Sequence, residues 1–138
     1  MRVVVGAAVV RDGAVLAAQR SYPADVAGRW ELPGGGVEPG EDDAAALRRE
    51  CVEEMGLAVT VGERLGPEVA IGRDRVLRVY RCTGDGEPSA LEHAELRWVR
   101  AEELDALDWL PADRDLLPAL TAVLTEDERA PVRRRGPS

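Results

Sequence analysis

The chain has 138 residues, a formal net charge of −8 at pH 7 and only two cysteines. This length suits one compact domain with a real core. The acidic balance argues against a nucleic-acid polymer as partner, and two cysteines make neither a disulfide framework nor a metal knuckle. We therefore expect a single domain over residues 1–126 and a flexible C-terminal tail over residues 127–138, which contains Arg133-Arg134-Arg135.

The N-terminal segment predicts a β-hairpin. Val3 to Val10 is apolar and rich in valine, and it ends at Arg11-Asp12-Gly13, a strong hairpin signal. Ala14 to Gln19 is expected to form the second strand. The apolar run is short and ends at a turn instead of a cleavage site, so it is not interpreted as a signal peptide. We expect a cytoplasmic protein with no membrane partner.

A helix is expected to follow a glycine-rich turn. Arg29 to Leu32 is interpreted as a short strand that leads into Pro33-Gly34-Gly35-Gly36. The helix should begin near Gly40, where Glu41-Asp42-Asp43 places negative charge in its first turn, as the helix dipole prefers. Gly56 should end the helix as a C-terminal glycine.

The second half of the chain predicts further strands and a final helix. The expected strands are Ala58 to Val69 (with a break near Gly62), Arg75 to Cys82, and Leu96 to Arg100. The final helix should run from about Pro111 to Leu124. Strands before, between and after two helices predict an α+β fold, an αβα sandwich with a mixed β-sheet.

Three carboxylates share one face of the first predicted helix. Residues three and four apart lie on the same side of a helix, so Glu50, Glu53 and Glu54 project into one arc. Such carboxylates repel each other unless a divalent cation lies between them. Hard cations take oxygen ligands, whereas zinc would favour histidines or cysteine pairs. The implied metal is Mg²⁺, with Mn²⁺ as a substitute.

The alternative is a solvated acidic face with no function. Leu47 and Cys51 define the buried side of this helix, and Glu54 lies only about 20° from Leu47 on a helical wheel. A purely structural helix rarely places a carboxylate there. Cys51 is interpreted as a small buried hydrophobic residue.

The segment over residues 34–57, GGGVEPGEDDAAALRRECVEEMGL, resembles the Nudix box position for position. From Gly35, five residues lead to Glu41 and seven more lead to Arg49-Glu50, followed by Cys51, Glu53-Glu54, Gly56 and Leu57. Only Cys51 departs from the common pattern, which has an aliphatic residue there. The resemblance implies the Nudix fold, with the box as a loop-helix-loop, and hydrolysis of a pyrophosphate bond. The candidate metal ligands are then Gly35, Glu50, Glu53, Glu54 and Glu92.

Outside the box the chain is similar to the MutT-type branch, nucleoside triphosphate pyrophosphohydrolases that include 8-oxo-dGTP and CTP hydrolases. Ala17-Ala18-Gln19-Arg20 precedes the loop to Trp30-Glu31-Leu32-Pro33-Gly34-Gly35, as in that branch. Glu92 lies six residues before Trp98, where the branch carries a loop glutamate that reaches the metals. Glu95 is the competing loop acid, and an ordinary exposed acid is the alternative for Glu92.

The same resemblance suggests three substrate contacts. Asp113 lies where the branch has an amide or carboxylate that reads the base. A carboxylate accepts hydrogen bonds, so it would select the N4 amino group of cytosine or the N1 and N2 hydrogens of guanine. The alternative is an ordinary acid in the first turn of a helix. Trp109 either stacks on the base or packs in the core, and Arg20 either contacts the nucleotide or only covers apolar surface.

The implied mechanism is attack by a metal-activated water, which yields a nucleoside monophosphate and pyrophosphate. Glu53, Glu50 or Glu92 would act as the general base, and Arg49 would orient the carboxylates. His93 is the only histidine, and neither a serine nor a cysteine lies in a nucleophile setting, so covalent catalysis is not expected.

Three functions remain open on the sequence. The first is a MutT-type triphosphatase in nucleotide-pool sanitation or dCTP and CTP turnover. The second is a Nudix hydrolase of another nucleoside diphosphate derivative, such as ADP-ribose or a dinucleoside polyphosphate. The third is a non-catalytic nucleotide-sensing domain, which the complete set of box carboxylates disfavours. The expected partner is a small nucleotide, and the expected state is a monomer or homodimer.

Overall fold

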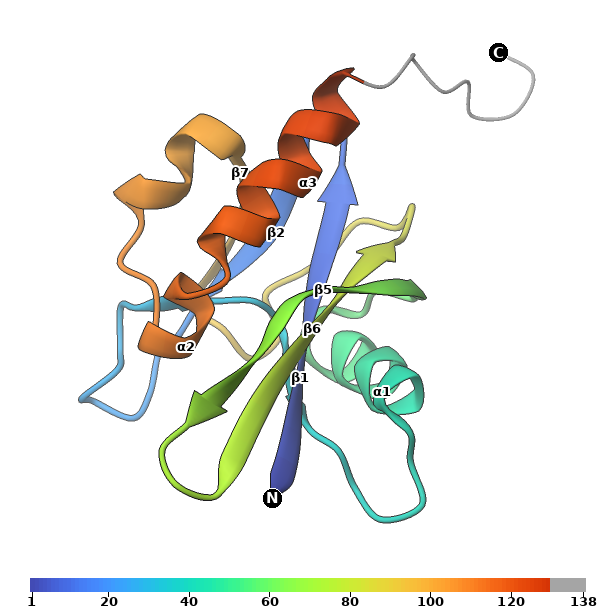
Figure 1. Cartoon of the computed structure of the whole chain (residues 1–138), viewed down its shortest axis with the longest axis vertical. Coiled ribbons are helices and arrows are strands. Elements are labelled where there is room, and N and C mark those ends of the chain that lie inside the picture. Colours follow the sequence, from blue (N-terminus) through green and yellow to red (C-terminus); the bar gives the residue numbers. More distant parts are fainter. Residues whose placement is uncertain (130–138) are drawn as a thin grey trace.

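The computed structural model describes residues 1–129 and has a twisted sheet between two helical layers. Helix α1 covers one face, and α3 with the 3-10 helix η1 covers the other (Figure 1). The predicted α+β sandwich with a mixed sheet is confirmed. In chain order the elements are β1 (Arg2–Arg11), β2 (Ala14–Gln19), β3 (Trp30–Glu31), β4 (Gly34–Gly36), α1 (Asp43–Met55), β5 (Thr60–Ile71), β6 (Arg75–Thr83), β7 (Glu95–Arg100), η1 (Ala101–Ala106), α2 (Pro111–Arg114) and α3 (Leu117–Arg129).

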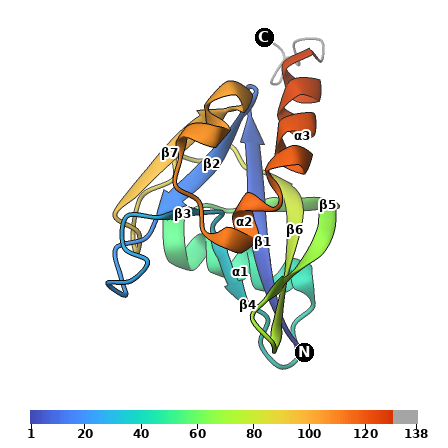
Figure 2. The same cartoon turned by 60° about the vertical axis from the view of Figure 1, so that its left-hand side comes forward.

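Strand β1 is the centre of the sheet. The strand order is β3-β2-β1-β6-β5, with β4 paired to β1 and β7 paired to β2. β1 runs parallel to β6 and antiparallel to both β2 and β4, which it pairs with at opposite ends (Figure 2). Strands β2 and β4 therefore separate from each other along β1, and the candidate site lies next to this separation.

The long apolar run of β1 reflects burial on both faces. Val5, Ala7 and Val9 belong to the core under α1. Ala8 and Val10 belong to the core under α3. Successive residues of a strand point to opposite faces, so a strand covered on both sides has no polar alternation.

The predicted hairpin is confirmed, with β1 paired to β2 next to the turn. Asp12 and Gly13 have φ values of 51° and 78°. Two consecutive positive φ values match the right-handed twist of the flanking strands, and Asp-Gly is a favoured pair for such turns.

Helix α1 begins three residues later than predicted, because Asp42, not Gly40, is the residue that caps it. The Asp42 side chain accepts a hydrogen bond from Ala45 N at 2.8 Å. Gly56 ends the helix as predicted, with φ 64°. Its N–H donates to Val52 O, and the N–H of Leu57 donates to Cys51 O, which satisfies carbonyls of the last turn.

The single helix predicted from Pro111 to Leu124 is two helices. α2 and α3 are separated by Asp115 and Leu116, and Leu116 N donates to Asp113 O at 2.9 Å in a turn. Strand β5 is irregular in two places, and the first irregularity includes Gly62, near which a break was predicted.

Strand β4 was predicted only as a turn. Gly34 to Gly36 pairs with Val4 to Gly6 of β1. Gly34 has φ 151°, and a Cβ atom there would overlap the Val5 carbonyl, so the close approach of the two backbones requires glycine. A run of glycines carries no hydrophobic alternation, which is why its strand character was missed.

The C-terminal helix is longer than predicted. α3 extends to Arg129, so the first residues of the predicted tail are helical, and Asp127 accepts a hydrogen bond from Gly13 N at 2.8 Å. The rest of that tail, with Arg133-Arg134-Arg135, lies outside the described residues. Within residues 1–129 no helix is long and apolar enough to cross a membrane.

Candidate active site

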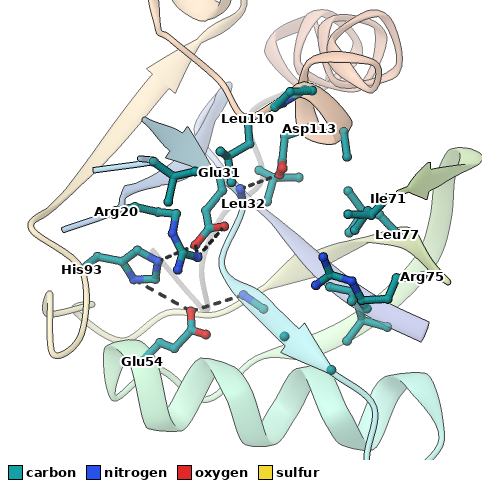
Figure 3. A pocket seen from close by; sticks show the side chains of 18 of the residues that line it. Arg20, Glu31, Leu32, Glu54, Ile71, Arg75, Leu77, His93, Leu110 and Asp113 are labelled. Atoms are coloured by element: carbon teal, nitrogen blue, oxygen red, sulfur yellow. Dashed lines mark hydrogen bonds and ion pairs between the residues drawn. The ribbon is translucent and has the colours of Figure 1, made fainter. Parts of the chain in front are cut away.

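A cavity of about 660 Å³ lies beside β4 and is walled by residues far apart in the sequence. Its walls come from β1, β4, the loop after β2, the β5–β6 turn, the loop before β7, and the start of α2. Figure 3 shows Glu54 at its lower end and Asp113 at the opposite end. The labelled polar residues that line it are Arg20, Glu31, Glu54, Arg75, His93 and Asp113.

Glu54 occupies the lower end and is only 7% exposed. Its Oε1 atom accepts a hydrogen bond from Gly34 N at 3.3 Å. Burial, followed by the nearby Glu50 charge, raises the pKa of Glu54 to about 9. The predicted buried position of Glu54 is confirmed.

Glu50 lies next to Gly35, one turn before Glu54 on α1. A Cβ atom at Gly35 would overlap the Glu50 carboxylate, so glycine leaves the space in which this carboxylate lies against the backbone. Burial raises the pKa of Glu50, and the Arg49 charge opposes the rise. A positive charge near these two adjacent carboxyl groups would lower both pKa values and favour their ionised forms.

Arg49 joins the box loop to the helix. Its Nε and Nη2 atoms donate to the two oxygens of Glu41 at 2.7 and 2.9 Å, and Nη2 also donates to Gly36 O at 3.1 Å. Nη1 donates to Glu53 at 3.3 Å and lies 3.5 Å from Glu50. This geometry fits the predicted orienting role of Arg49.

Glu53 differs from the other box acids because its side chain is 50% exposed and turned toward Arg49. Within residues 1–129, no three histidine, cysteine or carboxylate side chains are already gathered as metal ligands. The residues nevertheless fit a hard divalent cation: all donors are oxygens, Gly35 leaves room for the Glu50 carboxylate, and two of the acids have raised pKa values that a cation would lower.

The loop before β7 brings Glu92 to the same end. Glu92 lines the cavity, and its charge contributes to the raised pKa values of both Glu50 and Glu54. Glu95 is instead on β7, about half exposed, and pairs with Arg97 at 3.2 Å. Of the two competing acids, the geometry favours Glu92.

Asp113 lies at the other end of the cavity and is 7% exposed. Its Oδ2 atom accepts a hydrogen bond from Leu32 N at 2.9 Å (Figure 3). Burial raises the pKa of Asp113 to about 7, against the lowering effect of that hydrogen bond. Leu32, Leu110 and Ile71 supply apolar walls near it.

Trp109 was predicted either to stack on the base or to pack in the core; base stacking is corrected, and the core position is what the structure shows. Trp109 has no exposed surface, its Nε1–H donates to Leu104 O at 2.7 Å, and it is not a lining residue of the cavity. The indole is a core residue with its polar atom satisfied.

Three further charged or polar residues line the cavity that were not predicted from the sequence to do so: Glu31, His93 and Arg75. Arg20, which was predicted, lines the cavity and donates to both carboxylate oxygens of Glu31 at 3.2 and 3.3 Å. His93 Nε2 lies 2.9 Å from the same carboxylate. The proximity of Glu31 to the box and of His93 to Glu92 was the available signal, but only the fold shows that the two side chains meet.

The NUDIX domain model matches residues 1–120. The chain belongs to the Nudix family. Among curated Nudix relatives, "Putative 8-oxo-dGTP diphosphatase 2" of Mycobacterium tuberculosis is 48% identical over 127 residues, which cover 89% of this chain and 90% of the relative. CTP pyrophosphohydrolase of Escherichia coli is 39% identical over 123 residues, which cover 87% of this chain and 91% of the relative.

Solved Nudix structures share the fold. The solution structure of the E. coli ORF135 protein is 36% identical, with a TM-score of 0.77 and coverage of 94% of this chain and 95% of that protein. The MutT NUDIX hydrolase from Burkholderia pseudomallei is 34% identical, with a TM-score of 0.75 and coverage of 86% and 96%. The predicted Nudix fold and MutT-type resemblance are confirmed.

Proposed function

We propose that this Nudix enzyme hydrolyses nucleoside triphosphates of the 8-oxo-dGTP or CTP and dCTP type to a nucleoside monophosphate and pyrophosphate, in nucleotide-pool sanitation. One observation carries the proposal: a single cavity has the box carboxylate Glu54 at one end and the buried Asp113 carboxyl at the other. A nucleotide has the same polarity, with phosphates at one end and a hydrogen-bonding base at the other. The names of two similar proteins, an 8-oxo-dGTP diphosphatase and a CTP pyrophosphohydrolase, agree with it.

Nudix hydrolases use divalent cations, and the oxygen-only donors here favour Mg²⁺, with Mn²⁺ as a substitute. Gly35, Glu50, Glu53, Glu54 and Glu92 would hold the metal. When bound, the metal neutralises the phosphate chain and lowers the pKa of the attacking water.

The protein's own residues would divide the remaining work at the phosphate end. Arg49 keeps the box loop and the helix in register through Glu41 and the Gly36 carbonyl. Glu53, Glu50 or Glu92 takes the proton of the attacking water. Arg20, which lines the cavity, offers guanidinium hydrogens to the phosphate chain.

Asp113 would read the base. Leu32 N donates to Oδ2, which leaves acceptor capacity on the Asp113 carboxylate for a donor on the base edge. The N4 amino group of cytosine and the N1 and N2 hydrogens of guanine are such donors. The apolar residues around Asp113 exclude water, which strengthens a hydrogen bond made there.

A substrate screen with Mg²⁺ tests the proposal, with pyrophosphate detected separately from phosphate. We expect pyrophosphate from 8-oxo-dGTP, CTP or dCTP, and no net activity when EDTA is in excess. Strong hydrolysis of ADP-ribose or a dinucleoside polyphosphate, with none of the triphosphates, would instead assign the chain to that substrate class. Nucleotide binding without any hydrolysis would identify a sensing domain.

A further inference from the structure

His93 lines the cavity beside Glu54, and one of its nitrogens has no hydrogen-bond partner among residues 1–129. Its side chain is only 8% exposed, and Nε2 lies 2.9 Å from Glu31 Oε2. Nδ1 is buried, makes no hydrogen bond among the described residues, and lies 3.9 Å from Glu54 Oε1. Because a carboxylate beside an arginine accepts hydrogen bonds, we assign the Nε2 hydrogen as the donor to Glu31.

Glu31 also binds Arg20 and so links His93 to this arginine. Both oxygens of Glu31 accept from Arg20 Nη1, and Oε2 is shared with His93 (Figure 3). Arg20 Nε donates to Tyr22 O at 3.1 Å. Within residues 1–129, Nη2 has no hydrogen-bond partner, so its hydrogens remain for an anion in the cavity that Arg20 lines.

The backbone around His93 is held independently of the imidazole. Leu91 N donates to Glu54 O at 3.1 Å, and Ala94 N donates to Gln19 O at 2.8 Å. These bonds attach the loop to α1 on one side of His93 and to the end of β2 on the other. Removing the imidazole should therefore leave the loop in place and act mainly on the Glu31 carboxylate.

We propose that His93 is a positioning residue for the nucleotide: its Nε2–H orients Glu31, and Glu31 in turn orients Arg20 toward the phosphate chain. This inference rests on the proposed function, in which Arg20 contacts the phosphate chain. A structural core histidine would have apolar surroundings and satisfied nitrogens, whereas His93 lines the cavity and stands between two carboxylates. Without the imidazole, Glu31 would keep its hydrogen bonds with Arg20 but would lose the hydrogen bond from His93 that also orients its carboxylate.

The first test is a double-mutant cycle between His93 and Arg20, which do not bond to each other. The readout is the Kd of the non-hydrolysable α,β-methylene analogue of CTP, measured by calorimetry with Mg²⁺. We expect His93→Ala to weaken binding roughly tenfold, equivalent to about 1.4 kcal/mol. The double variant His93→Ala/Arg20→Ala should bind no more weakly than Arg20→Ala alone. If the two single substitutions weaken binding by factors that multiply in the double variant, the proposal is overturned.

The second test compares two amides that place a donor at different positions. Counted along the side chain, the nitrogen of glutamine occupies the place of Nε2 and that of asparagine the place of Nδ1. His93→Gln should therefore keep the Kd within about threefold of the parent value, and His93→Asn should weaken it as much as His93→Ala. Equal losses in the two amide variants would contradict the proposal, and the comparison remains decisive if His93→Ala does not fold.

The same samples separate this proposal from the proposed function. If the parent protein hydrolyses triphosphates but the cycle is additive, only the role of His93 fails. If the parent protein neither binds nor hydrolyses them and accepts ADP-ribose, the triphosphate assignment fails. The cycle is then measured with ADP-ribose, where the same non-additivity is expected, because its diphosphate would meet the same Arg20.

Discussion

Glu54 shows how a residue can oppose stability in the metal-free protein while serving the site. Its folded pKa is raised from 4.5 to about 9, so the folded protein binds the proton more tightly than the unfolded chain does. The resulting stability is fully present below pH 4.5 and is lost as pH rises toward 9. The carboxylate therefore destabilises the fold at neutral and alkaline pH unless a cation compensates it.

The first prediction follows from this destabilising effect of the Glu54 carboxylate. In EDTA at pH 8, Glu54→Gln should raise the free energy of unfolding by more than about 1.4 kcal/mol, the equivalent of one pKa unit. The gain should shrink as pH falls and disappear below pH 4.5, where Glu54 is protonated in both states. Urea unfolding at several pH values measures it. A variant that is less stable than the parent at pH 8 would show that Glu54 is satisfied without metal.

Gly35 and its neighbour Gly36 offer a matched pair for the second prediction. A Cβ atom at Gly35 would overlap the Glu50 carboxylate, whereas a Cβ atom at Gly36 would meet no atom of residues 1–129 within 4 Å. Gly35→Ala should displace that carboxylate and lower turnover about a hundredfold. Gly36→Ala should stay within about threefold of the parent rate. Thermal melts control for folding, and equal rates in both variants would dismiss the close packing of Gly35 and Glu50 as a requirement for activity.

At the scale of elements, the loop before β7 carries Glu92 and depends on contacts from β1. Arg11 Nη2 donates to the carbonyls of Gly84 and Gly86, and its guanidinium lies 4.8 Å from the centre of the Trp98 ring. The arginine thus connects the end of β1 to the start of the loop. The loop's far end is held separately, by Ala94 N on Gln19 O.

The third prediction is that Arg11→Ala loosens this loop. We expect kcat to fall roughly tenfold, because Glu92 would lose its fixed distance from Glu50 and Glu54, while the nucleotide Kd changes little. Arg48→Ala, an exposed arginine of α1, is the control and should leave both values unchanged. Hydrogen exchange over residues 84–94 provides an independent readout, and unaltered exchange in Arg11→Ala would refute the anchoring role.

The sequence predicts those elements whose conformation depends on the residues within them. The Asp12-Gly13 turn and the Gly56 helix end depend on backbone conformations that these residues adopt readily. The buried carboxylate at Glu54 followed from helical geometry alone. Strand β4 could not be predicted, because its glycines are defined by what they approach and not by any side-chain pattern.

The unpredicted parts of the site depend on contacts between distant residues. His93 and Glu31 are 62 positions apart and meet only because β2 pairs with both β3 and β7. Trp109 was ambiguous for a similar reason: its bridge to Trp30 and its bond to Leu104 O place the indole in the core. The local sequence around Trp109 is the same in either interpretation.

At the scale of the whole molecule, β1 lies between two hydrophobic cores. One core supports the metal and phosphate end of the proposed site, and the other supports the base end. The core under α1 supports the box acids, and the core under α3 supports the short helix that carries Asp113. The cavity joins the two ends across β1 and β4 (Figure 3). Variants at one end should therefore change one task and spare the other.

The most direct test of this division is kcat/KM of two variants on two substrates, CTP and dTTP, whose thymine lacks the amino donor of cytosine. Glu54→Gln should lower both values by at least about a hundredfold, equivalent to about 3 kcal/mol. Asp113→Ala should lower the value for CTP by roughly 1 to 3 kcal/mol while that for dTTP barely changes. Equal losses on both substrates in Asp113→Ala would mean that Asp113 supports the fold and does not read the base.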